Sequence, residues 1–172
     1  MGAQGVALIS EGYRRLNRQA HEDPAYGTSG HLHADLVQAV LSDGASLLDY
    51  GCGKQTLRAA IRCGEYRAYD PAIPGLDAEP APADVVYCGD VMEHVEPDCT
   101  DAVLEHVMSL ARVAAVFVIC CEGGRRVLGD GLPAHRNVRP PQFWRDRLSL
   151  FGRLEEHPGI AKKLEVRIVV WK

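Results

Sequence analysis

The stretch Ser46-Leu-Leu-Asp-Tyr-Gly-Cys-Gly-Lys54 decides the fold that we predict from the sequence. An apolar run ends in the carboxylate Asp49 and breaks into a glycine-rich turn, after which residues 54–63 have the composition of a helix. A strand, a tight turn and a helix are therefore expected in that order. Glycines at such a turn let the backbone come close to a ligand, and the start of a helix offers unpaired N–H groups. This pattern is typical of a cradle for a nucleotide-like ligand.

Length and charge limit the kind of protein that the chain can be. Its 172 residues fit a single domain over residues 1–172, long enough to bury a core. Nineteen basic and 23 acidic side chains give a net charge of −4, a balance that does not favour a nucleic acid partner. Six cysteines without disulfide-framework spacing, and no secretory leader before them, predict a cytoplasmic protein. No apolar run approaches the roughly 20 residues of a membrane helix, so no membrane partner is expected.

The first 30 residues predict a helix followed by a polar loop. Apolar residues recur at helical spacing from about Gln4 to Ala20 and indicate an amphipathic helix. Residues 21–30 mix turn formers with side chains that can bind polar ligands, and they predict a loop or lid. Two placements stay open, of which we favour a helix packed on the edge of the sheet. In the other, the segment closes over a ligand as a lid, with Tyr13, Asn17, His21 and Tyr26 facing it.

The next segments complete a βαβ unit around the glycine-rich turn. A second helical stripe over residues 32–41 precedes the opening strand, and residues 66–70 predict the strand that follows the turn and its helix. Asp70 ends this strand 21 positions after Asp49, where a carboxylate of a βαβ unit can hold the two hydroxyls of a ribose. The proline-rich residues 71–83 do not suit a normal helix, so this connection is expected to be abbreviated.

The second half of the chain alternates strands and helices and completes one α/β domain. The expected elements are a strand at 84–88, a loop at 89–97, a helix around 102–111, a buried strand at 113–121, a helix at 142–151 and two strands at 153–156 and 164–171. The loop over residues 122–141 is too long to be only a connector, and long loops of this kind usually carry function.

Three motifs together resemble a known family: Leu48–Lys54, Tyr69-Asp-Pro71 and Asp84–Pro97. In this order and spacing they resemble class I S-adenosylmethionine-dependent methyltransferases, in particular small bacterial and phage-type members with a DYGCGK turn and a DVMEH segment. The resemblance implies S-adenosyl-L-methionine as cofactor and methyl transfer to a small-molecule acceptor. It also implies a Rossmann-like sheet of seven strands, with helices on both faces and a C-terminal antiparallel hairpin, that binds the cofactor across the carboxyl ends of its strands.

Two features depart from the family pattern. Gln55 stands where the usual third glycine of the turn would be, which bears on how the following helix meets the cofactor. Residues 71–83 are too short for the usual strand and helix, so the residue that binds adenine is not placed, and Asp77 is only a guess.

The resemblance assigns cofactor and catalytic roles to residues of the three motifs. The implied cofactor-binding residues are Asp49, Gly51, Cys52, Gly53, Asp70, Pro71 and Asp90. Asp70 would hold the ribose hydroxyls, and Asp49 would lie near the methionine end. Asp90, Glu93 and His94 would line the site of methyl transfer.

The chemistry of methyl transfer asks the protein to position the acceptor and, for a hydroxyl or amine, to supply a base. His94, which follows Glu93 directly, and His135 are the candidates for that base. For His94 a bracing role in its loop stays open, and for His135 a solvated loop without a role. An anionic acceptor would suit the forked hydrogen bonding of arginine. The candidate substrate-binding residues are Arg136, Tyr26 and His21, with Arg139 as a further cation.

Other catalytic templates do not match. Thr56 breaks the G-x-G-x-x-G pattern of nicotinamide-binding turns, and no G-x-S-x-G elbow occurs. Neither H-E-x-x-H nor paired C-x-x-C spacing is present, so no metal is expected. Two rivals to methyl transfer remain: an enzyme that cyclises, cleaves or transfers another part of S-adenosylmethionine, and a non-catalytic module that binds it and acts through a partner. The expected assembly is a monomer or homodimer.

Overall fold

The core of the computed structural model, which describes residues 7–160 and 163–172, is one mixed β-sheet. Its strands are β1 (Ser46–Tyr50), β2 (Glu65–Tyr69), β3 (Ala83–Gly89), β4 (Ala111–Cys120), β5 (Arg153–His157) and β6 (Glu165–Trp171). In the described part they form six strands in the order β2-β1-β3-β4-β6-β5. The first four run parallel, and β6 and β5 add an antiparallel hairpin beside β4. The predicted Rossmann-like α/β class and its C-terminal hairpin are confirmed.

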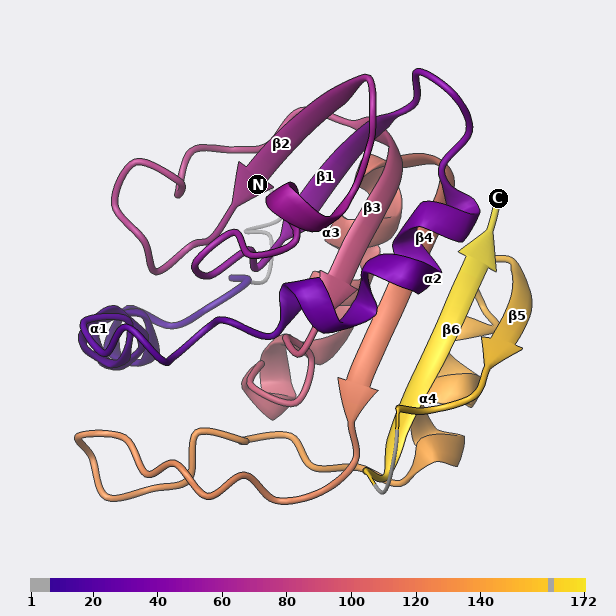
Figure 1. Cartoon of the computed structure of the whole chain (residues 1–172). Coiled ribbons are helices and arrows are strands. Elements are labelled where there is room, and N and C mark those ends of the chain that lie inside the picture. The colour runs from indigo at the N-terminus through magenta and orange to yellow at the C-terminus, as the bar shows by residue number, and fades with distance from the viewer. Residues whose placement is uncertain (1–6, 161–162) are drawn as a thin grey trace, which may run out of the picture.

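Helices cover both faces of the sheet, as Figure 1 shows. The described α-helices are α1 (Glu11–Ala20), α2 (Ala34–Val40), α3 (Thr100–Leu110) and α4 (Pro141–Leu148), with single 3₁₀ turns at Gly30–His33, Arg58–Ala60 and Pro97–Cys99. Helix α2 packs on one face, and α3 and α4 pack on the other. None of the helices in the described ranges has the length and apolar character needed to cross a bilayer.

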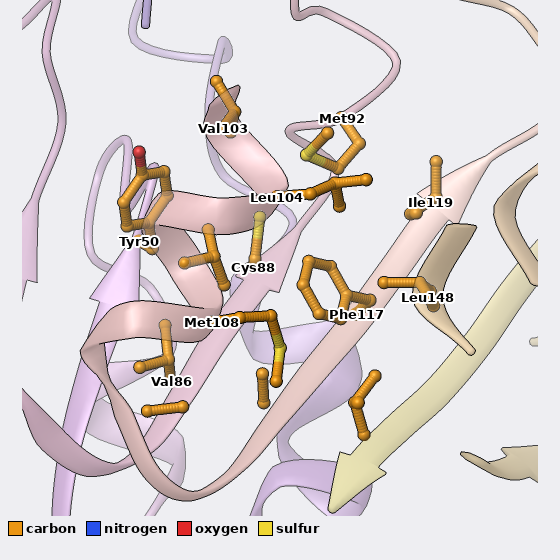
Figure 2. Packing of buried hydrophobic residues seen from close by; sticks show 14 of the residues in the cluster. Tyr50, Val86, Cys88, Met92, Val103, Leu104, Met108, Phe117, Ile119 and Leu148 are labelled. Atoms are coloured by element: carbon orange, nitrogen blue, oxygen red, sulfur yellow. The ribbon is translucent and has the colours of Figure 1, made fainter. Parts of the chain in front are cut away.

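Strand β4 shows how the sequence builds the two halves of the core. Its side chains alternate, so that Phe117 and Ile119 join the cluster under α3 and α4 while Val116 and Val118 join the cluster under α2. Figure 2 shows Phe117 packed among side chains from α3 and neighbouring strands. A strand buried on both faces needs a nearly continuous apolar run, which explains the composition of residues 111–120.

The predicted helix over residues 54–63 is wrong, because only the 3₁₀ turn Arg58–Ala60 forms there. Gln55 has a left-handed φ of 56°, a conformation that an α-helix does not contain. Leu57 is fully buried against Leu36 and Val37 of α2. Helix α2, which precedes β1, therefore covers the face of the sheet that a helix after β1 would otherwise cover.

The abbreviated connection after β2 accounts for the missing seventh strand. Residues 70–82 form turns without a helix or strand, and the Asp70 N–H donates to the Leu76 carbonyl at 2.9 Å. Strand β2 is therefore the edge of the sheet in the described part of the chain. The implied seven strands are corrected to six, whereas the short connection itself was predicted.

Helix α1 begins at Glu11 in the structure, because Ser10 caps it by accepting from the Tyr13 N–H at 3.2 Å. The predicted start at Gln4 lies outside the described residues. The favoured placement on the sheet edge is wrong, since α1 packs on the loop between β4 and α4. Tyr13 shares a cluster with Leu128 and Ala134, and its hydroxyl donates to the Ala134 carbonyl at 3.0 Å. In Figure 1 this loop runs below the strand ends and α1 lies to one side of them.

Candidate functional site

A pocket opens where the parallel strands end, between the sheet and the N-terminal segment. Its empty space, which includes the open solvent at its mouth, is about 880 Å³. The sheet side is formed by the ends of β1, β2 and β3, and the lid side by α1 and the loop after it. Predicted site residues that line it are Gly51, Gly53, Asp70, Pro71, Asp90, His94, His21 and Tyr26.

Five predicted residues do not line this pocket. They are Asp49, Cys52, Glu93, His135 and Arg136. Cys52 is buried beneath the turn, where burial raises the pKa of its thiol. The site therefore contains most of the predicted cofactor residues but only one of the three predicted catalytic residues.

The glycine-rich turn is held by the neighbouring strand and by the lid. The N–H groups of Gly51 and Cys52 both donate to the Tyr69 carbonyl, at 2.7 and 3.0 Å. Gly51 and Gly53 have left-handed φ values of 75° and 49°, which glycine adopts without strain. A Cβ on Gly51 would lie 2.3 Å from Val91 Cγ2, and one on Gly53 would lie 2.5 Å from the Gly27 carbonyl oxygen. Gly51 and Gly53 must therefore be glycine, because Val91 and Gly27 pack directly against them.

Asp70 reaches the pocket from the end of β2. Its carboxylate accepts from the N–H groups of Gly53 at 3.2 Å and Ala72 at 3.0 Å. His21 Nε2, on the lid side, lies 3.7 Å from Asp70 Oδ2. Burial lowers the pKa of His21, while the charge of Asp70 acts in the opposite direction. The Asp70 carboxylate thus contacts the glycine-rich turn, the loop after β2 and the lid.

Asp49 lies behind the turn rather than in the pocket. It is 3% exposed, and the Tyr66 hydroxyl donates to its Oδ2 at 2.5 Å. Burial raises its pKa to about 7, although the bond from Tyr66 acts to lower it. The two strand-end carboxylates that looked alike in the sequence therefore occupy different environments.

Asp90 follows β3 with a left-handed φ of 54°, which is uncommon outside glycine and concentrates at functional sites. His33 Nε2 lies 3.6 Å from Asp90 Oδ2. Burial acts to raise the pKa of Asp90, but the contacts with His33 and Ser29 bring it below its ordinary value. His33 is only 2% exposed. Sequence reasoning missed it, because its segment reads only as an apolar helical stripe.

His94 lines the pocket near Tyr26. Its Nδ1 lies 3.1 Å from the Ala134 carbonyl oxygen and 3.5 Å from the Tyr26 hydroxyl. Burial, and then the charge of His135, lower its pKa to about 4. The His135 ring is perpendicular to it, with centroids 4.7 Å apart. The structure therefore brings the two predicted histidines together, with His94 between His135 and the pocket.

Glu93 lies inside the protein next to this histidine pair. It is 1% exposed, and its Oε1 accepts a long bond of 3.4 Å from the Cys120 N–H. Its Oε2 has no hydrogen-bond partner within the described ranges. Burial, followed by the charge of Asp90, raises its pKa well above the ordinary value.

Arg136 and Arg139 are already engaged outside the pocket. Arg136 donates to Asp130 at 2.6 Å and lies 5.2 Å from the centroid of the Tyr13 ring. Arg139 donates to Asn137 and lies over the Phe143 ring. The described lining contains no arginine or lysine. This placement gives no support to the predicted role of Arg136 in holding an anionic acceptor.

Tyr50 is a pocket residue that sequence reasoning missed, although it stands directly before the turn. Its hydroxyl lies 2.9 Å from His106 Nδ1, and His106 Nε2 lies 2.9 Å from Glu79 Oε1. This chain of contacts ties the segment after β2 to α3. It fixes the pocket wall that Tyr50 shares with Pro71 and Ala72.

No protein-family model and no curated protein matches the sequence, but solved structures share its fold. One is an O-methyltransferase family protein from Burkholderia thailandensis, with a TM-score of 0.64 and 14% identity over 97% of this chain. This chain spans 64% of the length of that protein.

Two further structures match over nearly their whole length. The 1,6-didemethyltoxoflavin-N1-methyltransferase of Burkholderia thailandensis, with its acceptor and S-adenosylhomocysteine bound, has a TM-score of 0.60 and 18% identity, covering 100% of this chain and 93% of its own. Magnesium protoporphyrin IX methyltransferase of Synechocystis PCC 6803, with SAH bound, has a TM-score of 0.59 and 16% identity, covering 94% and 97%. The chain therefore has the fold of these methyltransferases.

Proposed function

We propose that the protein is an S-adenosylmethionine-dependent methyltransferase that acts on a small-molecule acceptor. The observation that carries this proposal is the convergence of Asp70, the Gly51–Gly53 turn and Asp90 on one pocket at the strand ends. Ligands of open α/β sheets bind at this edge. The shared fold with methyltransferases solved with S-adenosylhomocysteine bound supports the same proposal.

The residues of the pocket fit S-adenosylmethionine along its length. Asp70 offers a carboxylate for the ribose hydroxyls, and the apolar wall of Pro71, Ala72 and Val103 suits adenine. Asp90 offers a second carboxylate for the ammonium group of the methionine portion. A direct contact for Asp49 is no longer proposed, because its carboxylate is buried behind the turn.

We assign the acceptor to the part of the pocket lined by His94 and Tyr26, which we call the acceptor end. When bound, the cofactor supplies a methyl group that its sulfonium makes electrophilic, so the protein has chiefly to position the acceptor. His94 and Tyr26 line this end, and the lowered pKa keeps the His94 imidazole neutral near pH 7. The lone pair of this imidazole can accept a proton or bind a cation. The neighbouring side chains of Glu93 and His135 favour binding of a cation.

The charge of the chain and of the pocket lining supports a small-molecule acceptor. A net charge of −4 and the absence of lysine and arginine from the described lining favour a small uncharged or cationic acceptor over a nucleic acid. A cytoplasmic monomer or homodimer is the expected form.

Calorimetric titration with S-adenosylmethionine and S-adenosylhomocysteine tests the cofactor site. We expect Asp70→Ala to weaken binding more than about tenfold, because a charge-assisted hydrogen bond contributes about 1.5–3 kcal/mol. Asp70→Asn, which retains one acceptor oxygen, should lose less. The matched control is Asp43→Ala, because Asp43 is exposed before β1 and its carboxylate makes none of the described hydrogen bonds.

Equal affinity of a folded Asp70→Ala variant would refute the role of Asp70, and no heat with either ligand would refute the cofactor. Mass spectrometry after incubation with S-adenosylmethionine and a panel of phenols and alcohols tests the reaction. S-adenosylhomocysteine as product supports methyl transfer. Methylthioadenosine would indicate attack at another carbon and would replace the proposed reaction by one of its rivals.

A further inference from the structure

Three potential metal ligands meet behind the acceptor end of the pocket. Glu93, His94 and His135 each place one ligand atom within 4.8 Å of the others. The first two follow β3, and the third comes from the long loop between β4 and α4. We propose that these three side chains bind one divalent transition-metal ion. No metal-binding spacing in the sequence pointed to this site, because its ligands come from two distant segments.

The two histidines are oriented as metal-binding histidines usually are. His94 Nδ1 lies 3.1 Å from the Ala134 carbonyl oxygen, and His135 Nδ1 lies 2.8 Å from that of Glu122. A carbonyl only accepts, so each Nδ1 carries the proton and each Nε2 keeps its lone pair. A backbone carbonyl that fixes the tautomer in this way is the common outer partner of a metal-ligating imidazole.

Glu93 adds to the histidine pair a buried carboxylate oxygen that has no hydrogen-bond partner among the described residues. Its side chain is 1% exposed, and Oε2 has no partner in the described part of the chain. A buried carboxylate is costly unless it is paired or coordinates a metal. The histidines beside it bring no hydrogen bond to that oxygen, so a cation between the three groups would satisfy it.

The His135 ring packs so closely on Gly124 that no side chain fits at position 124. A Cβ on Gly124 would lie 2.7 Å from His135 Cδ2 and 2.8 Å from Nε2. A side chain at position 124 would therefore displace the imidazole. Glycine is required here by the position of the ring and not by the backbone, because the φ of Gly124 is not in the left-handed range.

Two imidazoles and one carboxylate favour Zn²⁺ or Fe²⁺ over Mg²⁺ or Ca²⁺, which prefer oxygen ligands. Three protein ligands leave a coordination position open, as in catalytic sites. Of the three, His94 lines the pocket, so the open position would face the acceptor. The acceptor class that fits is a small molecule with a hydroxyl group.

The role of such an ion rests on the proposed methyl transfer. A divalent cation lowers the pKa of a hydroxyl bound to it. The acceptor hydroxyl would pass its proton to water, and its oxygen would form the new bond to the methyl carbon. The electron pair of the broken carbon–sulfur bond would remain on sulfur. In this arrangement His94 serves as a ligand, and no protein base is needed.

Cobalt titration of the full chain after chelator treatment tests the site. Co²⁺ gives visible d–d absorption, and Zn²⁺ should then displace it. We expect one ion per chain, and binding at least about tenfold weaker in His135→Ala and Glu93→Gln, since even changes to outer partners cost about 10–100-fold. Gly124→Ala keeps all three ligands and should also weaken binding. His157→Ala is the matched control, because His157 pairs with Glu155 on β5.

The outcomes separate this site from the cofactor site. Binding of S-adenosylhomocysteine should persist in His135→Ala and Glu93→Gln, which also shows that these variants fold. No Co²⁺ binding by the wild-type chain would overturn the metal site and leave the cofactor site standing. An unchanged Co²⁺ affinity in His135→Ala, or thiolate-to-cobalt charge-transfer absorption in the near ultraviolet, would also overturn it, because the ion would then lie elsewhere.

Discussion

The two walls of the pocket are built from different kinds of contact. On the sheet wall, the Gly51–Gly53 turn and Asp70 are joined by backbone hydrogen bonds and by close backbone approach. On the lid wall, α1 and the loop at 21–30 are held on the loop at 122–140 through side chains, such as the Tyr13 hydroxyl on the Ala134 carbonyl and the exposed ion pair of Asp23 with Arg126. The sheet wall suits the proposed cofactor, and the lid wall suits the proposed acceptor.

Among the variants that test this difference between the two walls, we expect Gly51→Ala to lose the most folding stability. Gly51→Ala adds a Cβ that would lie 2.3 Å from Val91 Cγ2, at a φ of 75°. Left-handed strain costs about 1–2 kcal/mol and overpacking about 1–3 kcal/mol, so urea unfolding should show a loss of about 2–5 kcal/mol. Gly44→Ala is the matched control, because Gly44 has a φ of 74° with no atom within 4 Å of its added Cβ.

The difference between the two variants isolates the contact with Val91. Gly44→Ala should show the backbone strain alone, and adding Val91→Ala to Gly51→Ala should recover part of the difference. If both glycine variants lose the same stability, the turn is not sterically closed, and the sheet wall is as adaptable as the lid wall.

Local patterns predicted the sheet wall because they depend on neighbours in sequence. The apolar run of β4, the β1 turn and the acid at Asp70 each follow from composition and spacing. The helix after the turn failed for a non-local reason, since Leu57 packs into the cluster that α2 forms and Gln55 adopts a left-handed conformation. No pattern within residues 54–63 shows that another segment covers this face.

The structure of the lid wall depends on the paths of long loops. The hydrophobic periodicity of the sequence does not predict these paths. The contact of His135 with His94, and the pairing of Arg136 with Asp130, follow from the path of the loop at 122–140 over the strand ends. The sequence predicted His94 and His135 as separate candidates. Their meeting with Glu93, and the placement of α1 on that loop, required the structure.

Replacing Asp49 tests whether its carboxylate lies behind the turn, out of contact with a ligand in the pocket. Its pKa of about 7 in the folded protein stands above the ordinary 3.8, so between these pH values the folded chain binds more protons than the unfolded chain. Its contribution to stability is therefore present below about pH 4 and lost as the pH rises through 7. Asp49→Asn should remove this dependence and be about 1–2 kcal/mol more stable than the wild type at pH 8, because part of the gain is offset by the buried amide.

The difference between the two unfolding curves over pH 4–8 is the measurement, since groups that do not interact with Asp49 contribute equally to both curves. Cofactor affinity should stay within about threefold of the wild type, in contrast to Asp70→Ala, because Asp49 does not line the pocket. A large loss of affinity with a flat pH difference would place Asp49 at the cofactor and not behind the turn.

The smallest effect is expected where the two lid segments meet, at the ion pair of Asp23 with Arg126. Both side chains are more than a third exposed, and exposed pairs contribute little to stability. Arg126→Gln should leave the unfolding midpoint unchanged, as should Arg145→Gln in the exposed pair with Glu156. Only Arg126→Gln should speed dissociation of S-adenosylhomocysteine, by no more than about fivefold, because Arg126 also lies 4.9 Å from the centroid of the Tyr26 ring in the pocket wall.

Salt sharpens this last test, since 1 M NaCl screens exposed charges at about 3 Å. The wild-type dissociation rate in 1 M NaCl should approach that of Arg126→Gln at low salt, and the rate of Arg145→Gln should follow the wild type throughout. A loss of global stability in Arg126→Gln comparable to that of Gly51→Ala would show that the lid wall is part of the folded core. The difference between a sterically closed sheet wall and a lid held by separate side-chain contacts would then not hold.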